Sequence, residues 1–267
     1  MKGDRARVEP PTCSLAGTTF MSNFSNGAFY GIKNAQGFLT ATQSMVNNVI
    51  TKDGIFLSDN LMAINRNLSF LDDKKLMASF NTHTESAAEQ GTLWRIYVNC
   101  YFAKRAMALE GDFVECACYR GTTARIIADY VDLAESDKGI WLYDLFEHDE
   151  SMRHHAMSKH SSELFDDVTA RFADIENAHV TQGEVPAILA EVAPEKVSHA
   201  HLDLNDATAE LGALEFFFDR LVTGGTIIFD DYGWLYYRQQ KIAEDAWLAE
   251  RGYSILELPT GQGLLIK

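Results

Sequence analysis

Two apolar stretches of the chain end in acidic residues, and the type and position of these residues suit ligand binding or catalysis. Glu115 ends the stretch that starts at Gly111, and a short turn after it opens a helix. Asp230 and Asp231 directly follow the apolar run Gly225–Phe229. Ligands of open α/β sheets bind beyond the carboxyl ends of the strands. The two stretches therefore predict one site, with an organic cofactor at the first and a metal at the second.

A third carboxylate supports the metal prediction. Asp203 closes another expected strand, and neighbouring parallel strands lie less than about 5 Å apart. Asp203, Asp230 and Asp231 could therefore share one hard cation, and carboxylate oxygens suit Mg²⁺ or Ca²⁺ better than zinc. We expect Mg²⁺. In the alternative interpretation, Asp230 or Asp231 only caps the loop before Trp234.

The turn after Glu115 predicts S-adenosylmethionine as the organic cofactor. Its residues 115–121 fit the methyltransferase pattern E-x-G-x-x-x-G, with Ala117 in place of the first glycine. Small residues let backbone N–H groups and a helix N-terminus face the methionine carboxylate, and Glu115 can accept from the ammonium group. Arg120 and the adjacent hydroxyls can reach the carboxylate. The expected contacts from this turn are Glu115, Ala117, Tyr119, Arg120, Gly121, Thr122 and Thr123.

Two further strand ends supply the remaining cofactor contacts. Asp144 ends the next expected strand, where an acid can accept both ribose hydroxyls. Its alternative role is a cap at the strand end. Gln182 offers an amide near the adenine edge, although the turn before Pro186 could equally account for it. Asp203 is expected to contact the cofactor as well as the metal.

Strands and helices alternate after Gly111, which favours parallel βαβ units and a three-layer, Rossmann-like α/β fold. The last two strands are joined only by Pro259–Gly261, so they should form an antiparallel hairpin. The strands are expected at 112–118, 139–145, 178–182, 198–204, 225–230, 253–258 and 262–267. The helices are expected at 121–134, 161–174, 185–193, 207–222 and 238–251.

The segment before Gly111 is expected to have two parts. Residues 1–58 contain prolines, glycines and short aromatic segments, which predict a partly ordered N-terminal arm. Residues 59–110 show helical periodicity and form an expected helical extension that ends at Gly111. Residues 111–267 form the methyltransferase domain. The arm could exchange between subunits of a homo-oligomer.

Composition excludes several classes of partner. The chain of 267 residues has a formal net charge of −15, so it should repel nucleic acids and anionic membrane surfaces. The cysteines, Cys13, Cys100, Cys116 and Cys118, show neither zinc-site spacing nor a disulfide framework. Cys116 and Cys118 are expected to be buried thiols. Without a signal peptide or an apolar run long enough to span a membrane, we expect a cytoplasmic protein.

Several motifs, taken in order, resemble the macrocin O-methyltransferase family. They are Gly111–Cys116, Tyr143–Glu147, His201–Asp203, Asp219–Gly225, Phe229–Gly233 and Leu258–Gly263. The resemblance runs from about Asp59 to the C-terminus. It implies a magnesium-requiring, S-adenosylmethionine-dependent enzyme of natural-product tailoring that methylates sugar or related hydroxyls, and it implies the same three metal-binding aspartates.

One position departs from the pattern of the family. Its members commonly have Asp-x-Asp on the fourth strand, with the second acid as the proposed general base, whereas this chain has Asn205, which cannot take a proton. The expected lid, residues 148–160, carries histidines, which are the usual proton acceptors near neutral pH. His154 and His155 are the candidate bases. Asp206 competes with them, although its position predicts a helix N-cap.

These inferences predict a metal-assisted O-methyltransferase that acts on a hydroxyl of a small polar metabolite. A cofactor-binding protein without methyl transfer, such as a partner or regulatory subunit, is the main alternative. Ala117 and Asn205 favour that alternative, whereas the three intact aspartates argue against it. An NAD-linked oxidoreductase is a more distant alternative, because the chain lacks the G-x-G-x-x-G sequence of dinucleotide-binding folds.

Overall fold

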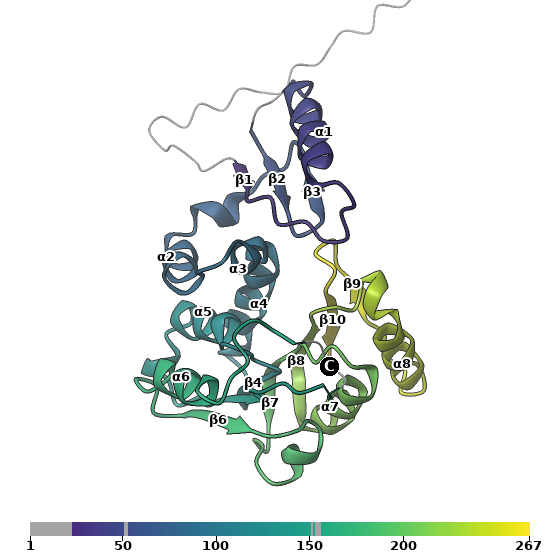
Figure 1. The fold of residues 1–267 in the computed structure, drawn as a ribbon. Coiled ribbons are helices and arrows are strands. Elements are labelled where there is room, and N and C mark those ends of the chain that lie inside the picture. The colour runs from purple at the N-terminus through teal and green to yellow at the C-terminus, as the bar shows by residue number, and fades with distance from the viewer. Residues whose placement is uncertain (1–22, 51–52, 151, 153–155) are drawn as a thin grey trace, which may run out of the picture.

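A seven-stranded mixed sheet forms the body of the molecule (Figure 1). The computed structural model describes residues 23–50, 53–150, 152 and 156–267. The strand order is β6-β5-β4-β7-β8-β10-β9, parallel from β6 to β8 and antiparallel at β10 and β9. The expected fold class, with its antiparallel terminal hairpin, is confirmed. The strands are β4 (Asp112–Cys116), β5 (Ile140–Asp144), β6 (Ala178–Gln182), β7 (Val197–Leu202), β8 (Leu221–Phe229), β9 (Leu256–Glu257) and β10 (Gly263–Ile266).

Helices cover both faces of this sheet because neighbouring strand residues point to opposite sides. Phe113 packs into the core cluster that contains residues of α4 and α5, whereas Val114 packs with residues of α7 and α8. The helices of the first face are α2 (Lys74–His83), α4 (Leu93–Ala106), α5 (Thr122–Tyr130) and α6 (Leu164–Arg171). The second face carries α7 (Ala207–Arg220) and α8 (Arg238–Ala249).

Some expected element boundaries were wrong. The helix expected at 185–193 is only the short 3₁₀ turn η3 (Ala187–Ala190), which follows Pro186. The helix expected at 121–134 ends as α5 at Tyr130, and η2 (Leu133–Glu135) follows it. The strand expected to begin at Gly225 begins at Leu221, directly after α7. The element types between Gly111 and the C-terminus otherwise match.

A small three-stranded sheet precedes the body and lies at the top of Figure 1. β1 (Asn23–Ser25) pairs in parallel with β2 (Ile55–Ser58), which pairs antiparallel with β3 (Leu61–Ala63), and α1 (Ala35–Asn47) lies between β1 and β2 in the chain. We call residues 23–63 the N-terminal unit. Of the expected arm, residues 1–22 and 51–52 lie outside the described residues. Its expected exchange between subunits stays a prediction.

The expected helical pattern from Asp59 was wrong for this part of the chain. Asp59 and Asn60 form the two-residue turn of the β2–β3 hairpin, with φ of 53° and 56°. Such turns need positive φ at both positions, which Asp and Asn tolerate. The first α-helix after the hairpin begins at Lys74. None of the described helices is long and apolar enough to span a membrane.

A buried histidine in β7 predicts how stability depends on pH. His199 is 1% exposed, its Nδ1 lies 2.9 Å from Thr226 Oγ1, and burial lowers its pKa to about 3. The unfolded chain binds a proton there near pH 6.5, whereas the native chain does not. The stability conferred by the neutral ring is therefore complete above about pH 6.5 and is lost as the pH falls toward 3, by at most about 1.4 kcal/mol per unit.

We predict that His199→Gln removes this pH dependence. Urea unfolding of both proteins at pH 7 and pH 5 should show that the stability advantage of wild type over the variant shrinks by about 2 kcal/mol on acidification. An advantage that stays constant would mean that His199 titrates normally in the native state.

Candidate active site

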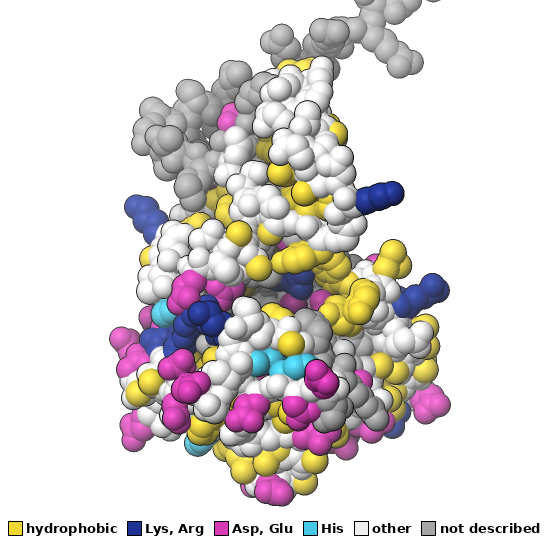
Figure 2. Space-filling view, viewed as in Figure 1, with side chains coloured by type: hydrophobic (Ala, Val, Ile, Leu, Met, Phe, Trp, Pro, Cys, Tyr) yellow, Lys and Arg dark blue, Asp and Glu magenta, His cyan; other side chains and the backbone are white. Residues whose placement is uncertain are grey.

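One cavity of about 1630 Å³ opens at the carboxyl ends of the parallel strands. The β4–α5 turn, the ends of β5, β7 and β8, and the segment from Trp234 to Tyr237 line it. The N-terminal unit and α3 (Ala87–Gly91) contribute the opposite wall. Figure 2 shows the hollow between the N-terminal unit and the sheet body, with apolar side chains gathered at its rim. Leu235 and Tyr236, 87% and 88% exposed, belong to that rim.

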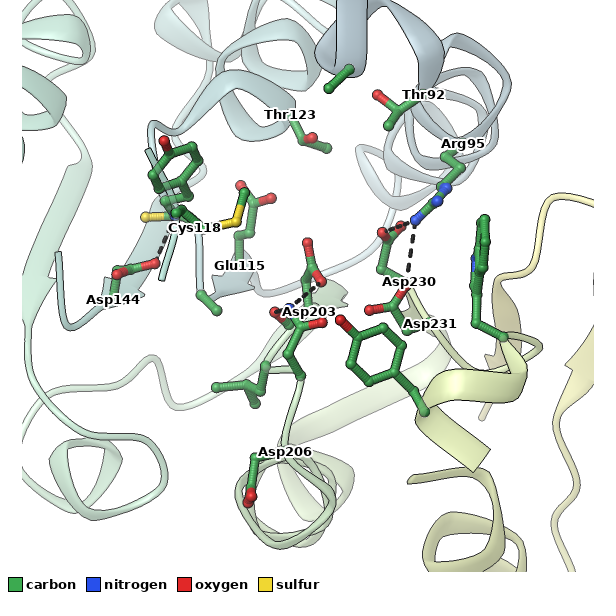
Figure 3. A pocket seen from close by; sticks show the side chains of 18 of the residues that line it. Thr92, Arg95, Glu115, Cys118, Thr123, Asp144, Asp203, Asp206, Asp230 and Asp231 are labelled. Carbon is green, nitrogen blue, oxygen red and sulfur yellow. Dashed lines mark hydrogen bonds and ion pairs between the residues drawn. The ribbon is translucent and has the colours of Figure 1, made fainter. Parts of the chain in front are cut away.

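The β4–α5 turn has the tight backbone that the sequence predicts. Ala117, Tyr119 and Gly121 have φ of 62°, 49° and 66°, and Gly121 is the N-cap of α5. Asp144 holds this turn, since its Oδ2 accepts from the Tyr119 N–H at 2.7 Å and its Oδ1 accepts from the Phe146 N–H at 2.6 Å. Asp144 thus has the capping role that was its alternative interpretation. Its carboxylate also lines the cavity (Figure 3).

A buried acceptor at the cofactor end lacks a protein partner. Glu115 Oε1 accepts from His201 Nδ1 at 2.9 Å, whereas Glu115 Oε2 is buried without a hydrogen-bond partner among the described residues. An unpaired carboxylate oxygen is costly to bury unless a ligand satisfies it. Its position near the end of β4, before the turn that leads to the N-terminus of α5, fits an acceptor for the ammonium group of S-adenosylmethionine.

The structure brings most of the predicted cofactor residues to this cavity. Those that line it are Glu115, Ala117, Tyr119, Arg120, Thr122, Thr123, Asp144 and Asp203. Gly121 instead shapes the turn. Gln182 does not line the cavity, because its amide donates to the Leu145 carbonyl at 2.9 Å, while the neighbouring Gly183 and Glu184 do. Gln182 therefore ties the strand end to the following loop.

Arg120 has different partners from those expected. Its guanidinium pairs with Glu85 at 2.7 Å and with Glu89 at 2.8 Å, and Thr122 Oγ1 donates to the same Glu89 at 3.1 Å. Glu89 also completes the capping box with Ser86 at the start of α3. The expected contacts of Arg120 and Thr122 with the methionine carboxylate would thus be made beside a carboxylate of the protein itself.

The three predicted metal ligands all line the other end of the cavity (Figure 3). Burial raises the pKa of Asp231 to about 7, with a further contribution from Asp230. Burial, followed by the charges of Asp230 and Asp231, raises the pKa of Asp203 well above its ordinary value. Burial alone would also raise the pKa of Asp230, but Arg95 and His201 outweigh it and hold this pKa below the ordinary range. The carboxylates are therefore close enough to repel one another.

The aspartate end of the cavity has the negative charge and the oxygen donors that a divalent cation needs, but its side chains are not arranged around a cation. Oxygen donors and an excess of carboxylates are what Mg²⁺ binds. Among the described residues, however, no group of three or more His, Cys, Asp or Glu side chains is arranged as ion ligands. Asp230 instead engages Arg95 Nη1 through Oδ2 at 2.5 Å, and Arg95 Nη1 also lies 3.5 Å from Asp231. Binding a cation would require these side chains to rearrange.

The predicted bases are only partly placed. His154 and His155 lie outside the described residues. The same loop reaches the cavity through Met157–His160. Asp206 caps α7, because its Oδ1 accepts from the N–H groups of Thr208 and Ala209 at 3.0 and 2.9 Å. Asn205 has φ of 58°, and its amide donates to Asp203 Oδ1 at 3.3 Å.

Sequence reasoning missed three polar residues of this site. Arg95 lies on α4, Asp59 lies in the N-terminal unit, and His201 lies on β7 between the two acidic ends. Burial would lower the pKa of His201, but Asp230 and Glu115 outweigh it and raise this pKa well above its ordinary value. Two features of the sequence could have indicated such residues: a charged residue within the apolar pattern of α4, and a histidine within a buried strand.

The strand order, the terminal hairpin and the cavity at the strand ends define a class I methyltransferase. The model of the macrocin-O-methyltransferase (TylF) family matches residues 98–252, more than half of the chain. The chain therefore belongs to this family of S-adenosylmethionine-dependent O-methyltransferases, as the sequence motifs predict. No curated protein matches the sequence closely.

Solved structures agree on the fold. The O-methyltransferase NovP is 18% identical with a TM-score of 0.57, over 69% of this chain and 82% of NovP. CalS11, a TDP-rhamnose 3'-O-methyltransferase of calicheamicin biosynthesis, is 13% identical with a TM-score of 0.55, over 90% of this chain and 96% of CalS11. The SAH-bound methyltransferase PaMTH1 of Podospora anserina is 12% identical with a TM-score of 0.50, over 87% and 96% of the two chains.

We predict that Asp144→Ala weakens binding of S-adenosylhomocysteine by about 1.5–3 kcal/mol, the value of charge-assisted hydrogen bonds. Isothermal calorimetry measures the affinity. The matched control is Asp112→Ala, because Asp112 likewise accepts two N–H groups, from Gly139 and Trp141, but does so at the amino end of β4. The control should lose stability without losing affinity. Equal affinities of Asp144→Ala and wild type would remove Asp144 from the cofactor site.

Proposed function

We propose that the protein methylates a hydroxyl of a small polar metabolite, a sugar or related diol of natural-product tailoring, with a divalent cation held by Asp203, Asp230 and Asp231. One observation carries the proposal: the unpartnered Glu115 Oε2 and the three aspartates line the same cavity. A methyl donor bound at Glu115 and a methyl acceptor bound at the aspartates would therefore lie in contact. CalS11, with its sugar substrate, supports the substrate class.

S-adenosylmethionine supplies an electrophilic methyl group, so the residues of the chain must mainly bind and align the reactants. Glu115 would accept from the ammonium group of the donor, and Asp144 would accept from its ribose. The first N–H groups of α5 would bind its carboxylate. Trp234 and Tyr237 line the cavity beside the aspartates, where their rings would pack against the acceptor.

The aspartates would hold Mg²⁺, which lowers the pKa of a bound hydroxyl and orients two vicinal oxygens. Burial, followed by the charges of neighbouring carboxylates, raises the pKa of Asp203 and of Asp231, so a cation at this place would relieve a cost that the protein alone leaves. Because Asn205 cannot act as a base, we assign proton acceptance to His154 or His155 of the lid. Asp206 is the competitor, although its Oδ1 already accepts two backbone N–H groups.

A cofactor-binding protein without methyl transfer is the second candidate, favoured by Asn205 at the position of the expected base. Turnover separates the two candidates. The purified chain is assayed with S-adenosylmethionine, Mg²⁺ and a library of sugars and diols, and formation of S-adenosylhomocysteine is measured. Methyl transfer to a library member supports the enzyme. Tight cofactor binding without transfer to any member supports the second candidate.

Removing the cation should abolish turnover but leave cofactor binding intact. We predict that dialysis against EDTA, or Asp231→Asn, lowers kcat on the order of 100-fold while the affinity for S-adenosylhomocysteine is unchanged, because the cation acts on the acceptor. Re-addition of Mg²⁺ should restore the dialysed wild type but not the variant. Full activity after EDTA treatment would contradict a role for the cation.

The base assignment predicts a second kinetic difference. His154→Gln combined with His155→Gln should lower kcat on the order of 100-fold at unchanged cofactor affinity, and the wild-type rate should rise through a pKa near 6–7. Asp206→Ser keeps a side-chain acceptor at the N-cap, so it should keep both stability and kcat. The opposite result, a slow Asp206→Ser variant and a normal double variant, would transfer the role to Asp206.

A further inference from the structure

One arginine, Arg95, lies beside Asp230 and Asp231 at the acceptor end of the cavity (Figure 3), and it also contacts the buried Asp59. Arg95 is 8% exposed. Its Nε and Nη2 donate to the two oxygens of Asp59 at 2.6 and 2.7 Å. Its Nη1 donates to Asp230 Oδ2 at 2.5 Å and lies 3.5 Å from Asp231 Oδ1. The guanidinium therefore contacts both Asp59 and the two residues Asp230 and Asp231, which we call the acidic pair.

Asp59 reaches this place from the N-terminal unit, outside the region that matches the family model. The Asp59 N–H donates to the Ala28 carbonyl at 2.7 Å. The preceding Ser58 hydroxyl contacts Asn26 Oδ1 at 2.5 Å and the Gly91 carbonyl at 3.1 Å. A Cβ on Gly91 would lie 2.8 Å from Ala28 Cβ and 3.4 Å from Ser58 Oγ, so α3 is in close contact with the segment after β1 and with the hairpin. The hairpin is thus fixed against α3, which directly precedes α4, the helix of Arg95.

Arg95 Nη1 lies between the two carboxylates that a bound cation would share. Asp230 Oδ2 is engaged by Arg95, and Asp230 Oδ1 accepts from Gln262 at 2.9 Å and from His201 at 3.2 Å. A positive charge a few Å from a divalent cation opposes its binding in this low-dielectric setting. Asp59 has the reverse effect, because it attracts the guanidinium away from the acidic pair and adds a negative charge.

We propose that Asp59 and Arg95 form a charge clamp through which the N-terminal unit sets the cation affinity of the acidic pair. Arg95 is a positioning residue that orients Asp230 and opposes the cation, and Asp59 limits that opposition. The inference rests on the proposed cation site. The clamp predicts that replacing Arg95 strengthens cation binding and that replacing Asp59 weakens it. If the two residues were needed only for folding, both replacements would weaken cation binding.

Mn²⁺ binding to the full chain tests these signs, since the electron paramagnetic resonance signal of free Mn²⁺ gives the dissociation constant. We predict that Arg95→Gln binds Mn²⁺ about tenfold more tightly than wild type and that Asp59→Asn binds it about tenfold more weakly. The matched control is Asp132→Asn, because Asp132 also has positive φ, 55°, but forms an exposed ion pair with Lys75. The control should bind Mn²⁺ as wild type does.

A double-mutant cycle tests whether Asp59 acts through Arg95. Asp59→Asn should change Mn²⁺ affinity much less in the Arg95→Gln background than in wild type. If Arg95→Gln fails to fold, Arg95→Lys replaces it, because an ammonium lacks the planar fork that engages both oxygens of Asp59. The effect of Asp59→Asn should shrink in that background as well. Affinity for S-adenosylhomocysteine should stay unchanged in each folded variant.

The outcomes separate the clamp from the proposed cation site. Weaker or unchanged Mn²⁺ binding by Arg95→Gln, or fully additive effects in the cycle, overturns the clamp. If wild type binds no Mn²⁺ but Arg95→Gln does, the clamp holds and the cation requirement of the wild-type enzyme fails. If neither protein binds Mn²⁺, both inferences are wrong.

Discussion

A row of alternating charges runs along the cavity, and the geometry of the site depends on it. Glu115 contacts His201 at 2.9 Å, and His201 contacts Asp230 at 3.2 Å. Asp230 contacts Arg95 at 2.5 Å, and Arg95 contacts Asp59 at 2.6 Å. These residues come from β4, β7, the position after β8, α4 and the β2–β3 turn. Since a buried charge is tolerated only beside its partners, each residue constrains the position of the next. The cofactor end and the acceptor end are thus held at a fixed separation.

This row explains why the N-terminal unit belongs to the site although it lies outside the family match. Its hairpin supplies the last carboxylate, and its Tyr30 ring lies 6.1 Å from that of Trp234, which itself lies 5.0 Å from the Arg95 guanidinium. The unit therefore completes the wall that faces the acceptor. This part of the cavity wall therefore comes from a segment outside residues 98–252, the part of the chain that matches the family model.

The sequence predicts those features of the fold and site that depend on local pattern. Apolar runs that end in Glu115, Asp144, Asp203 and Asp230 identify strand ends, and parallel pairing then brings these acids to one edge of the sheet. Partners such as Arg95 and Asp59 could not be predicted, because they are 36 residues apart and meet through tertiary packing alone. The hairpin turn at Asp59 was missed because Leu61 fits the apolar spacing of a helix as well as it fits a strand.

Two departures from the family pattern acquire a physical explanation from the backbone. Ala117 replaces a glycine yet keeps φ of 62°, a conformation that costs a residue with a Cβ about 1–2 kcal/mol. Asp144 offsets part of that cost by holding the Tyr119 N–H of the same turn. Asn205, with φ of 58°, occupies the left-handed region that Asn tolerates, and its amide donates to Asp203 where a carboxylate would repel it. The exchange of an acid for an amide thus removes a base but also removes one negative charge from a cluster that already carries an excess. Asn205 therefore lowers the charge repulsion around Asp203 at the position where the family pattern has an acid.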